Sequence, residues 1–292
     1  MRLLQDAPLD GPVNMARDEA LMTRVGTGES APTLRLYQWD PPTISLGYFQ
    51  RYAEYEALPP PARDLPVVRR QTGGGAILHD LELTYSLTLP VDHPLLAKGS
   101  NRLYELMHDG IVACLGELGV TASPCGHTDD SGPTRGPFFC FDRRHAYDVL
   151  IDGNKVAGSA QRRTRQAVLQ HGSIILGNRY RQQSTAMLGI VDRVRRADQL
   201  SGASDVPRTQ LPGVSSGPRG EPYPLDITPP TRGGATFGSF EETVERVRST
   251  IAGRFAALCG ADIEPGDWSA AELAAAEALV PKYAGDEWTK RL

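Results

Sequence analysis

Hydrophobic residues recur at helical and strand spacings along most of the chain, and their pattern predicts a mixed fold. Apolar side chains at helical spacing predict a helix over residues 14–25, with Asn14 as its N-cap, and amphipathic helices over residues 102–118 and 240–258. Strand-like runs, of which residues 34–39 and 83–89 alternate apolar and polar positions, predict strands over residues 34–39, 43–47, 65–71, 83–89, 147–151, 155–161 and 168–176. Because strands and helices do not alternate strictly, we expect an α+β fold, a mixed β-sheet flanked by helices.

Two stretches break this periodicity and suggest how the chain is divided. Residues 121–137 and about 200–237 are rich in glycine, proline and serine, a composition typical of exposed loops. We therefore predict a catalytic core over residues 1–199 and a Gly/Pro-rich loop or insertion over residues 200–238. The remaining residues, 239–292, are expected to form C-terminal helices that pack on the core.

Composition and charge narrow the class of protein. The formal net charge of -4 over 292 residues does not suit non-specific nucleic-acid binding, which needs a basic surface. No apolar run is long enough for a membrane span, and the first residues turn acidic before any signal-peptide core forms. The four cysteines form no CxxC pair and no zinc-site spacing. We expect a monomeric cytoplasmic enzyme with free thiols and without a metal, binding neither nucleic acid nor membrane.

A glycine-rich segment is the first sign of chemistry. Arg69 and Arg70 precede Thr72 and three glycines, and His79 follows them. Exposed backbone amides in such a loop can bind an anion or polarise a carbonyl group, but the segment matches neither the P-loop nor the GxGxxG pattern. Taken alone, the glycines are more typical of a turn between two strands.

Cys140 differs from the other cysteines in its surroundings. It lies among phenylalanines at the end of the loop of residues 121–137, and Arg143, Arg144 and His145 follow directly. Nearby cations stabilise a thiolate, which makes Cys140 a candidate nucleophile. The alternative is that it packs as a small apolar residue, as we expect for Cys114.

Lys155 follows the Asp152–Gly153 turn and begins a strand of small residues. Strict alternation would place Lys155 on one face together with Ala157, Ser159 and Gln161. A lysine that faces small residues can hold a carbonyl or carboxylate group, although an exposed strand lysine more often only adds solubility. His171, in the neighbouring predicted strand, is by itself best interpreted as a hydrogen-bonded core histidine.

Four ordered motifs resemble the lipoate/biotin protein ligase superfamily. They are LRLYQW at residues 34–39, VRRQTGGGAILHD at residues 68–80, DGNKVAGSAQ at residues 152–161 and LQHGSI at residues 169–174. The resemblance covers about the first 190 residues and returns at Lys282–Tyr283 and Glu287–Trp288. The run ELTYS at residues 82–86, with a cysteine ahead of the lysine hairpin, is most similar to the LipM-type octanoyltransferases.

This resemblance implies a lipoate/biotin protein ligase catalytic-domain fold and an octanoyltransferase of lipoate biosynthesis. It implies Cys140 as the acyl-thioester nucleophile and Lys155 as the group that activates the acyl carbonyl. The donor would be octanoyl-acyl carrier protein, and the acceptor a lysine of a lipoyl domain or of the glycine-cleavage H protein. No cofactor is then required. The residues expected to bind substrate are Arg70, Thr72, Gly73, Gly74, Gly75, His79, Gly158, Ser159, Ala160, His171 and Gly172.

Three other functions fit parts of the same pattern. An ATP-dependent lipoate-protein ligase would use ATP and Mg²⁺ and would need no cysteine, and Gly75 makes the loop equally similar to that of the ligases. An octanoyl-amidotransferase would move the acyl group between lipoyl carriers, also through Cys140. A non-catalytic acyl- or carrier-binding protein belongs to a different class, and the intact Cys140, Lys155 and glycine loop argue against it.

Overall fold

The computed structural model describes residues 1–99, 101–126, 137–177, 190–202, 237–260 and 262–292, and their fold is the predicted α+β type. Eight strands form a mixed sheet in the order β11-β1-β2-β6-β10-β9-β8-β7, and three more form a small sheet in the order β4-β3-β5. The eight strands are β1 (Arg2–Gln5), β2 (Thr33–Tyr37), β6 (Glu82–Pro90), β7 (Ser123–Pro124), β8 (Val149–Ile151), β9 (Asn154–Arg163), β10 (Ala167–Ile175) and β11 (Glu264–Pro265). The small sheet comprises β3 (Thr43–Leu46), β4 (Val67–Arg69) and β5 (Ile77–His79).

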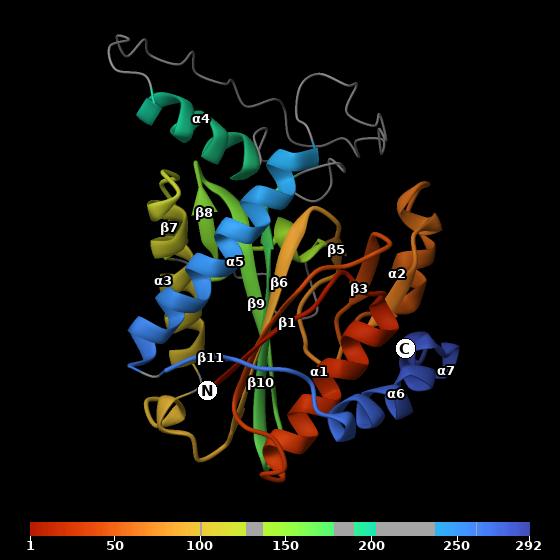
Figure 1. Cartoon of the computed structure of the whole chain (residues 1–292). Helices are drawn as coiled ribbons and strands as arrows, with labels where there is room; N and C mark the ends of the chain where they lie inside the picture. The colour runs from red at the N-terminus through yellow and green to blue at the C-terminus, as the bar shows by residue number, and fades with distance from the viewer. Residues whose placement is uncertain (100, 127–136, 178–189, 203–236, 261) are drawn as a thin grey trace.

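Helices cover the large sheet on both sides. Figure 1 shows α3 and α5 on one side of the strands and α1 and α6 on the other. The helices are α1 (Gly11–Gly26), α2 (Tyr52–Glu56), α3 (Arg102–Glu117), α4 (Ile190–Gly202), α5 (Phe237–Cys259), α6 (Ala270–Ala284) and α7 (Asp286–Thr289). The predicted helices and strands are confirmed, whereas the short strands β1, β5, β7 and β11 and the helix α4 were not predicted. The predicted insertion, residues 200–238, lies almost entirely outside the described residues.

The start of α1 corrects one prediction. The helix begins at Gly11, and Asp10 is its N-cap, because the Asp10 carboxylate accepts a hydrogen bond from the Val13 amide. Asn14 lies inside the helix and is fully buried, where its side-chain amide donates to the carbonyl oxygens of Leu9 and Gln38. The prediction of Asn14 as the cap was therefore wrong, since this asparagine joins the helix to β2 instead.

The two faces of the central strands differ in chemistry. Leu83, Tyr85, Leu87 and Leu89 of β6 point into the main hydrophobic core against α3 and α5. The alternate residues of β6 are polar, and they are also buried, on the face that α1 and the small sheet cover. A polar layer sealed from water must satisfy its own hydrogen bonds. This polar face of the sheet is where the predicted site residues gather.

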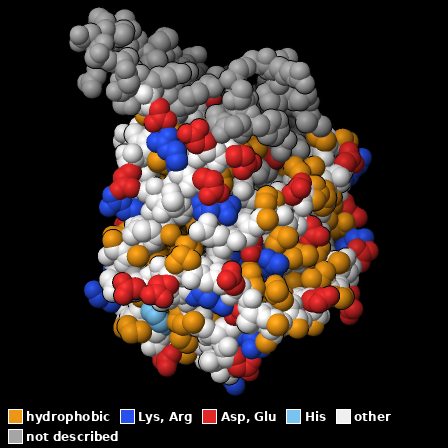
Figure 2. Space-filling view, in the orientation of Figure 1, with side chains coloured by type: hydrophobic (Ala, Val, Ile, Leu, Met, Phe, Trp, Pro, Cys, Tyr) orange, Lys and Arg blue, Asp and Glu red, His pale blue; other side chains and the backbone are white. Residues whose placement is uncertain are grey.

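The surface shows no concentration of one charge on the face seen in Figure 2. Acidic and basic side chains are interspersed there, and hydrophobic side chains gather on the right-hand side of the view. No helix among the described residues combines the length and the apolar character needed to cross a bilayer.

Candidate acyl-transfer site

The glycine loop, residues 70–76, connects β4 to β5 and is shaped from within by Arg70. Arg70 is 2 % exposed, and its guanidinium group donates to the backbone oxygens of Gly73 and Gly75, each at 2.7 Å. Its other bonds reach the Ser45 carbonyl oxygen at 2.9 Å and the Thr72 hydroxyl at 3.1 Å. Burial lowers the pKa of Arg70 to about 10, so the group remains a cation at neutral pH. Arg70 therefore holds the loop in shape and places a positive charge beneath it.

The loop lies directly against Cys140. The Ala76 amide donates to the Phe138 carbonyl oxygen at 2.9 Å, and the Cys140 amide donates to the Ala76 carbonyl oxygen at 2.7 Å. A β-carbon at Gly75 would stand 2.9 Å from the Cys140 nitrogen, so this position requires glycine in the observed backbone. Cys140 begins a short 3-10 helix, Cys140–Asp142, and is partly exposed. The two segments that sequence analysis selected separately thus form one structure.

Lys155 provides a cation close to the sulfur. Its Nζ lies 3.8 Å from Cys140 Sγ and 2.8 Å from the carboxylate of Asp148, and both charged side chains are buried. Burial by itself would lower the pKa of Lys155, but Cys140 and Asp148 outweigh burial and raise it. Lys155 is therefore a protonated ammonium group at neutral pH, able to stabilise negative charge on the sulfur or on a carbonyl oxygen bound there. Among their contacts, Arg143 Nε donates to the Pro137 carbonyl oxygen and Arg144 Nη1 donates to that of Phe141.

A β-bulge aims Lys155 at this site and corrects the predicted alternation. Val149 of β8 pairs with Ala157, but the next residue, Leu150, pairs with Lys155, so Val156 is an extra residue in β9. Val156 and Ala157 both join the main core, and Lys155 lies against Gly158. The prediction that Lys155 shares a face with Ala157 and Ser159 was therefore wrong, because the bulge reverses the alternation at this point.

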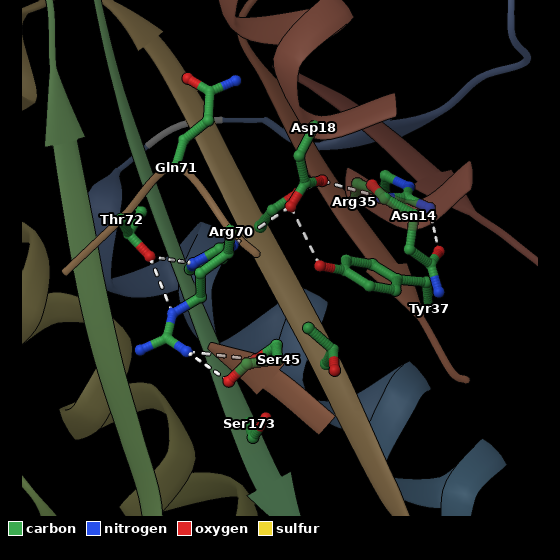
Figure 3. Close-up of polar contacts among 12 residues, drawn as sticks. Asn14, Asp18, Arg35, Tyr37, Ser45, Arg70, Gln71, Thr72 and Ser173 are labelled. Atoms are coloured by element: carbon green, nitrogen blue, oxygen red, sulfur yellow. Dashed lines mark hydrogen bonds and ion pairs between the residues drawn. The ribbon is translucent and has the colours of Figure 1, made fainter. Parts of the chain in front are cut away.

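A buried chain of hydrogen bonds, here called the relay, connects the glycine loop to residues of the sheet and of α1. Arg70 Nε donates to the Thr72 hydroxyl, Thr72 Oγ1 lies 2.6 Å from His171 Nε2, and His171 Nδ1 lies 3.2 Å from Asp18. Figure 3 shows Thr72 beside Arg70, and Asp18 pointing toward Arg35. Burial lowers the pKa of His171 despite Asp18, so its ring is neutral at pH 7. A neutral ring that donates to Asp18 through Nδ1 accepts the Thr72 hydroxyl at Nε2, which makes every bond of the relay consistent.

His79 occupies a second relay beside the first. Its Nδ1 lies 2.7 Å from the Glu82 carboxylate and its Nε2 lies 2.8 Å from the Ser45 hydroxyl. The ring stacks on Trp39 with centroids 3.8 Å apart. Both nitrogens of His79 are thus occupied by protein groups, which makes its ring a wall of the site.

Ser159 is anchored from the opposite face of the sheet. The Nε2 atom of His108, in α3, is 2.5 Å from the hydroxyl oxygen of Ser159. The Nδ1 atom of the same ring contacts the carbonyl oxygen of Tyr147. Burial lowers the pKa of His108 to about 4, so the ring is neutral and accepts the serine hydroxyl through Nε2. Gly172 leaves room for this arrangement, since a β-carbon there would stand 2.6 Å from Ser159 Oγ.

A narrow pocket leads inward from Cys140, with an empty volume of about 470 Å³ including its open mouth. Nine of the predicted site residues line it, namely Cys140, Arg70, Gly74, His79, Gly158, Ser159, Ala160, His171 and Gly172. Much of the remaining lining is apolar or aromatic, namely Met15, Tyr37, Trp39, Ile77 and Phe141. The arrangement suits an apolar acyl chain whose carbonyl group lies near the Cys140 sulfur.

Four predicted residues lie just behind this lining. Thr72, Gly73 and Gly75 belong to the loop, and Lys155 reaches Cys140 across Gly158. Sequence analysis missed the pocket residues Met15, Tyr37 and Trp39, as well as Asp148. A signal for the polar layer did exist: Asp18 is a carboxylate on the apolar side of a predicted helix, and a buried carboxylate requires a partner.

Comparisons with known proteins identify the family of the chain. Residues 10–206 match the family described as the lipoyl protein ligase A/B catalytic domain. Octanoyltransferase LipM from Kyrpidia tusciae is 37% identical over 99% of this chain and 98% of its own length. Octanoyltransferase LipM from Brevibacillus brevis is 32% identical over 96% of this chain and 94% of its own length.

Solved structures share the fold. A lipoate-protein ligase A bound with ATP has a TM-score of 0.61 at 20% identity, covering 99% of this chain and 98% of its own. A bipartite lipoate protein ligase from Thermoplasma acidophilum has a TM-score of 0.60 at 21% identity, covering 99% and 95%. The expected superfamily and fold are both confirmed, and the chain belongs to the lipoyl protein ligase A/B catalytic domain family.

Proposed function

We propose that this chain transfers an octanoyl group through a thioester on Cys140, from octanoyl-acyl carrier protein to a lysine of a lipoyl domain or of the glycine-cleavage H protein. The overall reaction, octanoyl transfer in lipoate biosynthesis, is that of its full-length relatives, and the chain is an acyltransferase of that kind. The carriers, the thioester and the cytoplasmic location are our proposals. The observation that carries the thioester is the buried Lys155 ammonium group 3.8 Å from a sulfur at the mouth of an apolar pocket.

In the first step, the Cys140 thiolate attacks the carbonyl carbon of the donor thioester. A bond forms between that carbon and Sγ, the donor's carbon–sulfur bond breaks, and the carrier thiol leaves and takes up a proton. The negative charge that develops on the carbonyl oxygen needs donors close to the sulfur. Lys155 is one such donor, and each well-placed donor typically contributes about 3 kcal/mol.

The glycine loop offers further donors for the same oxygen. Within the part of the chain that the structure describes, the backbone N–H groups of Gly73, Gly74 and Gly75 donate to no protein acceptor. Arg70 binds the carbonyl oxygen of Gly73 and so fixes the peptide group that carries the Gly74 amide. A preorganised loop of this kind can stabilise an oxyanion without reorganising during the reaction.

In the second step, the acceptor lysine attacks the acyl-enzyme as a free amine. A carbon–nitrogen bond forms, the bond to Sγ breaks, and the amine proton restores the Cys140 thiol. Lys155 is a poor base for this step, because the buried Asp148 carboxylate still favours its protonated form after Cys140 has been acylated. The structure therefore favours Lys155 as an electrophilic donor in both steps.

The donor is already activated as a thioester, so we propose that neither ATP nor Mg²⁺ takes part. Intact mass spectrometry tests this directly: wild-type protein and the Cys140→Ser variant are mixed with octanoyl-acyl carrier protein in the absence of ATP. We expect a hydroxylamine-sensitive octanoyl adduct on the wild-type protein alone, which discharges when an apo lipoyl domain is added.

Two other outcomes would each identify a rival function. Modification of the lipoyl domain that requires ATP and free acid, with no adduct on Cys140, would make the chain a ligase. An adduct that forms only from an octanoylated carrier domain would make it an amidotransferase.

A further inference from the structure

One large hydrophobic side chain stands out on the surface close to the site. Phe49 is 72 % exposed, more than any other large hydrophobic residue among those the structure describes. It belongs to the turn of residues 47–50, which follows β3 directly. A single exposed apolar side chain is common on protein surfaces, so the meaning of Phe49 depends on the residues around it.

The turn that carries Phe49 is fixed to the catalytic loop. The Tyr48 amide donates to the Thr72 carbonyl oxygen at 2.8 Å, and the Gln50 side chain donates to the Phe138 carbonyl oxygen at 3.1 Å. Gly47 packs on Gly74 so tightly that a β-carbon at Gly47 would stand 2.0 Å from the Gly74 carbonyl oxygen. The turn that carries Phe49 is therefore held against Gly74, which lines the pocket.

Two arginines from distant parts of the chain join this turn. The Tyr48 ring contacts Phe49 edge to face at 4.8 Å, and the Arg291 guanidinium lies 3.7 Å from the Tyr48 ring centroid. Arg162 lies 5.1 Å from the same ring, two residues beyond Ala160 of the pocket lining. We call Tyr48, Phe49, Arg162 and Arg291 the aromatic rim, and it combines an exposed apolar group with positive charge.

The two substrates differ in how far their reacting groups extend from the protein that carries them, and this difference indicates which substrate must contact the aromatic rim. An acyl group on a carrier protein arrives on a long pantetheine arm, so the donor can load Cys140 with little contact around the mouth. A lysine side chain is much shorter, and Cys140 is only partly exposed. The domain that carries the acceptor lysine must therefore bring its own surface against the residues beside the mouth.

We propose that the aromatic rim is the docking surface for the acceptor domain, which presents an acidic surface and an apolar contact next to its target lysine. The proposal rests on the thioester mechanism above and adds the surface that recognises the second substrate. Phe49 supplies the apolar anchor, and Arg162 and Arg291 supply charge complementarity.

The test separates docking from chemistry by using the isolated acyl-enzyme. Wild type, Phe49→Ser and Arg162→Glu are loaded from octanoyl-acyl carrier protein, and then discharged either by an apo lipoyl domain or by hydroxylamine. Hydroxylamine needs no docking surface. The matched control is Leu273→Ser, since Leu273 is 39 % exposed and lies in the first turn of α6, away from the contacts with the glycine loop.

We expect both rim variants to load normally and to react normally with hydroxylamine. Their kcat/KM for the lipoyl domain should fall about tenfold or more, as when an interface anchor is removed. The salt dependence of transfer should also weaken in Arg162→Glu. Unchanged transfer, or equal slowing of loading and of hydroxylamine discharge, would overturn the docking proposal. Failure of the wild-type protein to load would instead overturn the thioester mechanism.

Discussion

Gly158 leaves the space in which the Lys155 ammonium group reaches Cys140. A β-carbon on Gly158 would stand 2.6 Å from Lys155 Cε and 2.9 Å from its Nζ. The atoms in the way are the end of a flexible side chain, so a Gly158→Ala variant should fold and displace the lysine. We expect acyl-enzyme formation to slow on the order of a hundredfold, as when one oxyanion donor is lost, with little change in the thermal unfolding temperature.

Gly73→Ala is the matched control for that variant. Gly73 lies in the same site, but a β-carbon there would meet nothing within 4 Å. We expect its acylation rate to remain within a few-fold of wild type. Equal losses in the two variants would mean that any added methyl group disturbs the site, and the specific role of Gly158 would have to be abandoned.

Asp148 should set the alkaline limit of the reaction. Burial lowers the pKa of Lys155, and Cys140 and Asp148 raise it to above its ordinary value. A raised pKa keeps the ammonium group charged to higher pH, so wild-type activity should decline only when pH rises past that value. In Asp148→Asn one of the raising charges is gone, and the decline should begin at lower pH. Single-turnover acylation rates measured from pH 7 to 11 would show this shift. If the rate declines at the same pH in both proteins, the Asp148–Lys155 ion pair does not set the alkaline limit.

The sequence predicts the chemical residues better than it predicts their support. Cys140, Lys155 and the glycine loop are recognisable because each is an unusual residue type in a local pattern. Asp148 carries no such signal, since it becomes a partner of Lys155 only where β8 meets the bulge in β9. The bulge is invisible to a period-2 pattern, which is why the predicted face of Lys155 was wrong.

The apolar lining escaped prediction for a different reason. Met15, Tyr37 and Trp39 are typical core residues in their own helix and strand, and only the pairing of elements turns them toward one cavity. The fold class itself was predictable, because long amphipathic helices and alternating strands leave few ways to form layers. Short strands such as β1, which has four residues, form through pairing with strands that are distant in the sequence, so a local pattern does not predict them.

Thr72 should couple loop stability to catalysis. Its hydroxyl joins Arg70 Nε at 3.1 Å to His171 Nε2 at 2.6 Å, and both partners are buried. Thr72→Val keeps the shape of the side chain but leaves both groups without this partner, at a typical cost of about 1–3 kcal/mol. We expect lower stability in urea together with slower acylation, whereas Thr72→Ser should stay close to wild type. A valine variant as stable and as active as wild type would show that the relay is dispensable.

Glu272 connects the C-terminal helices to the first strand, and its contribution to the free energy of unfolding should be lost at acidic pH. Its carboxylate contacts Arg2 at 2.6 Å and Ser30 at 2.6 Å, and it completes a capping box with Ser269. Burial would raise the pKa of Glu272, but the Arg2, Ser30 and Ser269 hydrogen bonds outweigh burial and lower it to about 2.

Because the folded-state pKa of Glu272 is depressed, its stabilisation is complete above the unfolded value of about 4.3 and is lost as pH falls toward about 2. Glu272→Gln should therefore cost on the order of 2 kcal/mol at pH 7, and this difference from wild type should shrink below about pH 4. Urea unfolding of both proteins at pH 7, 5 and 3.5 would measure the difference. A cost that stays constant across this range would mean that glutamate acts here through shape and neutral hydrogen bonds rather than through its charge.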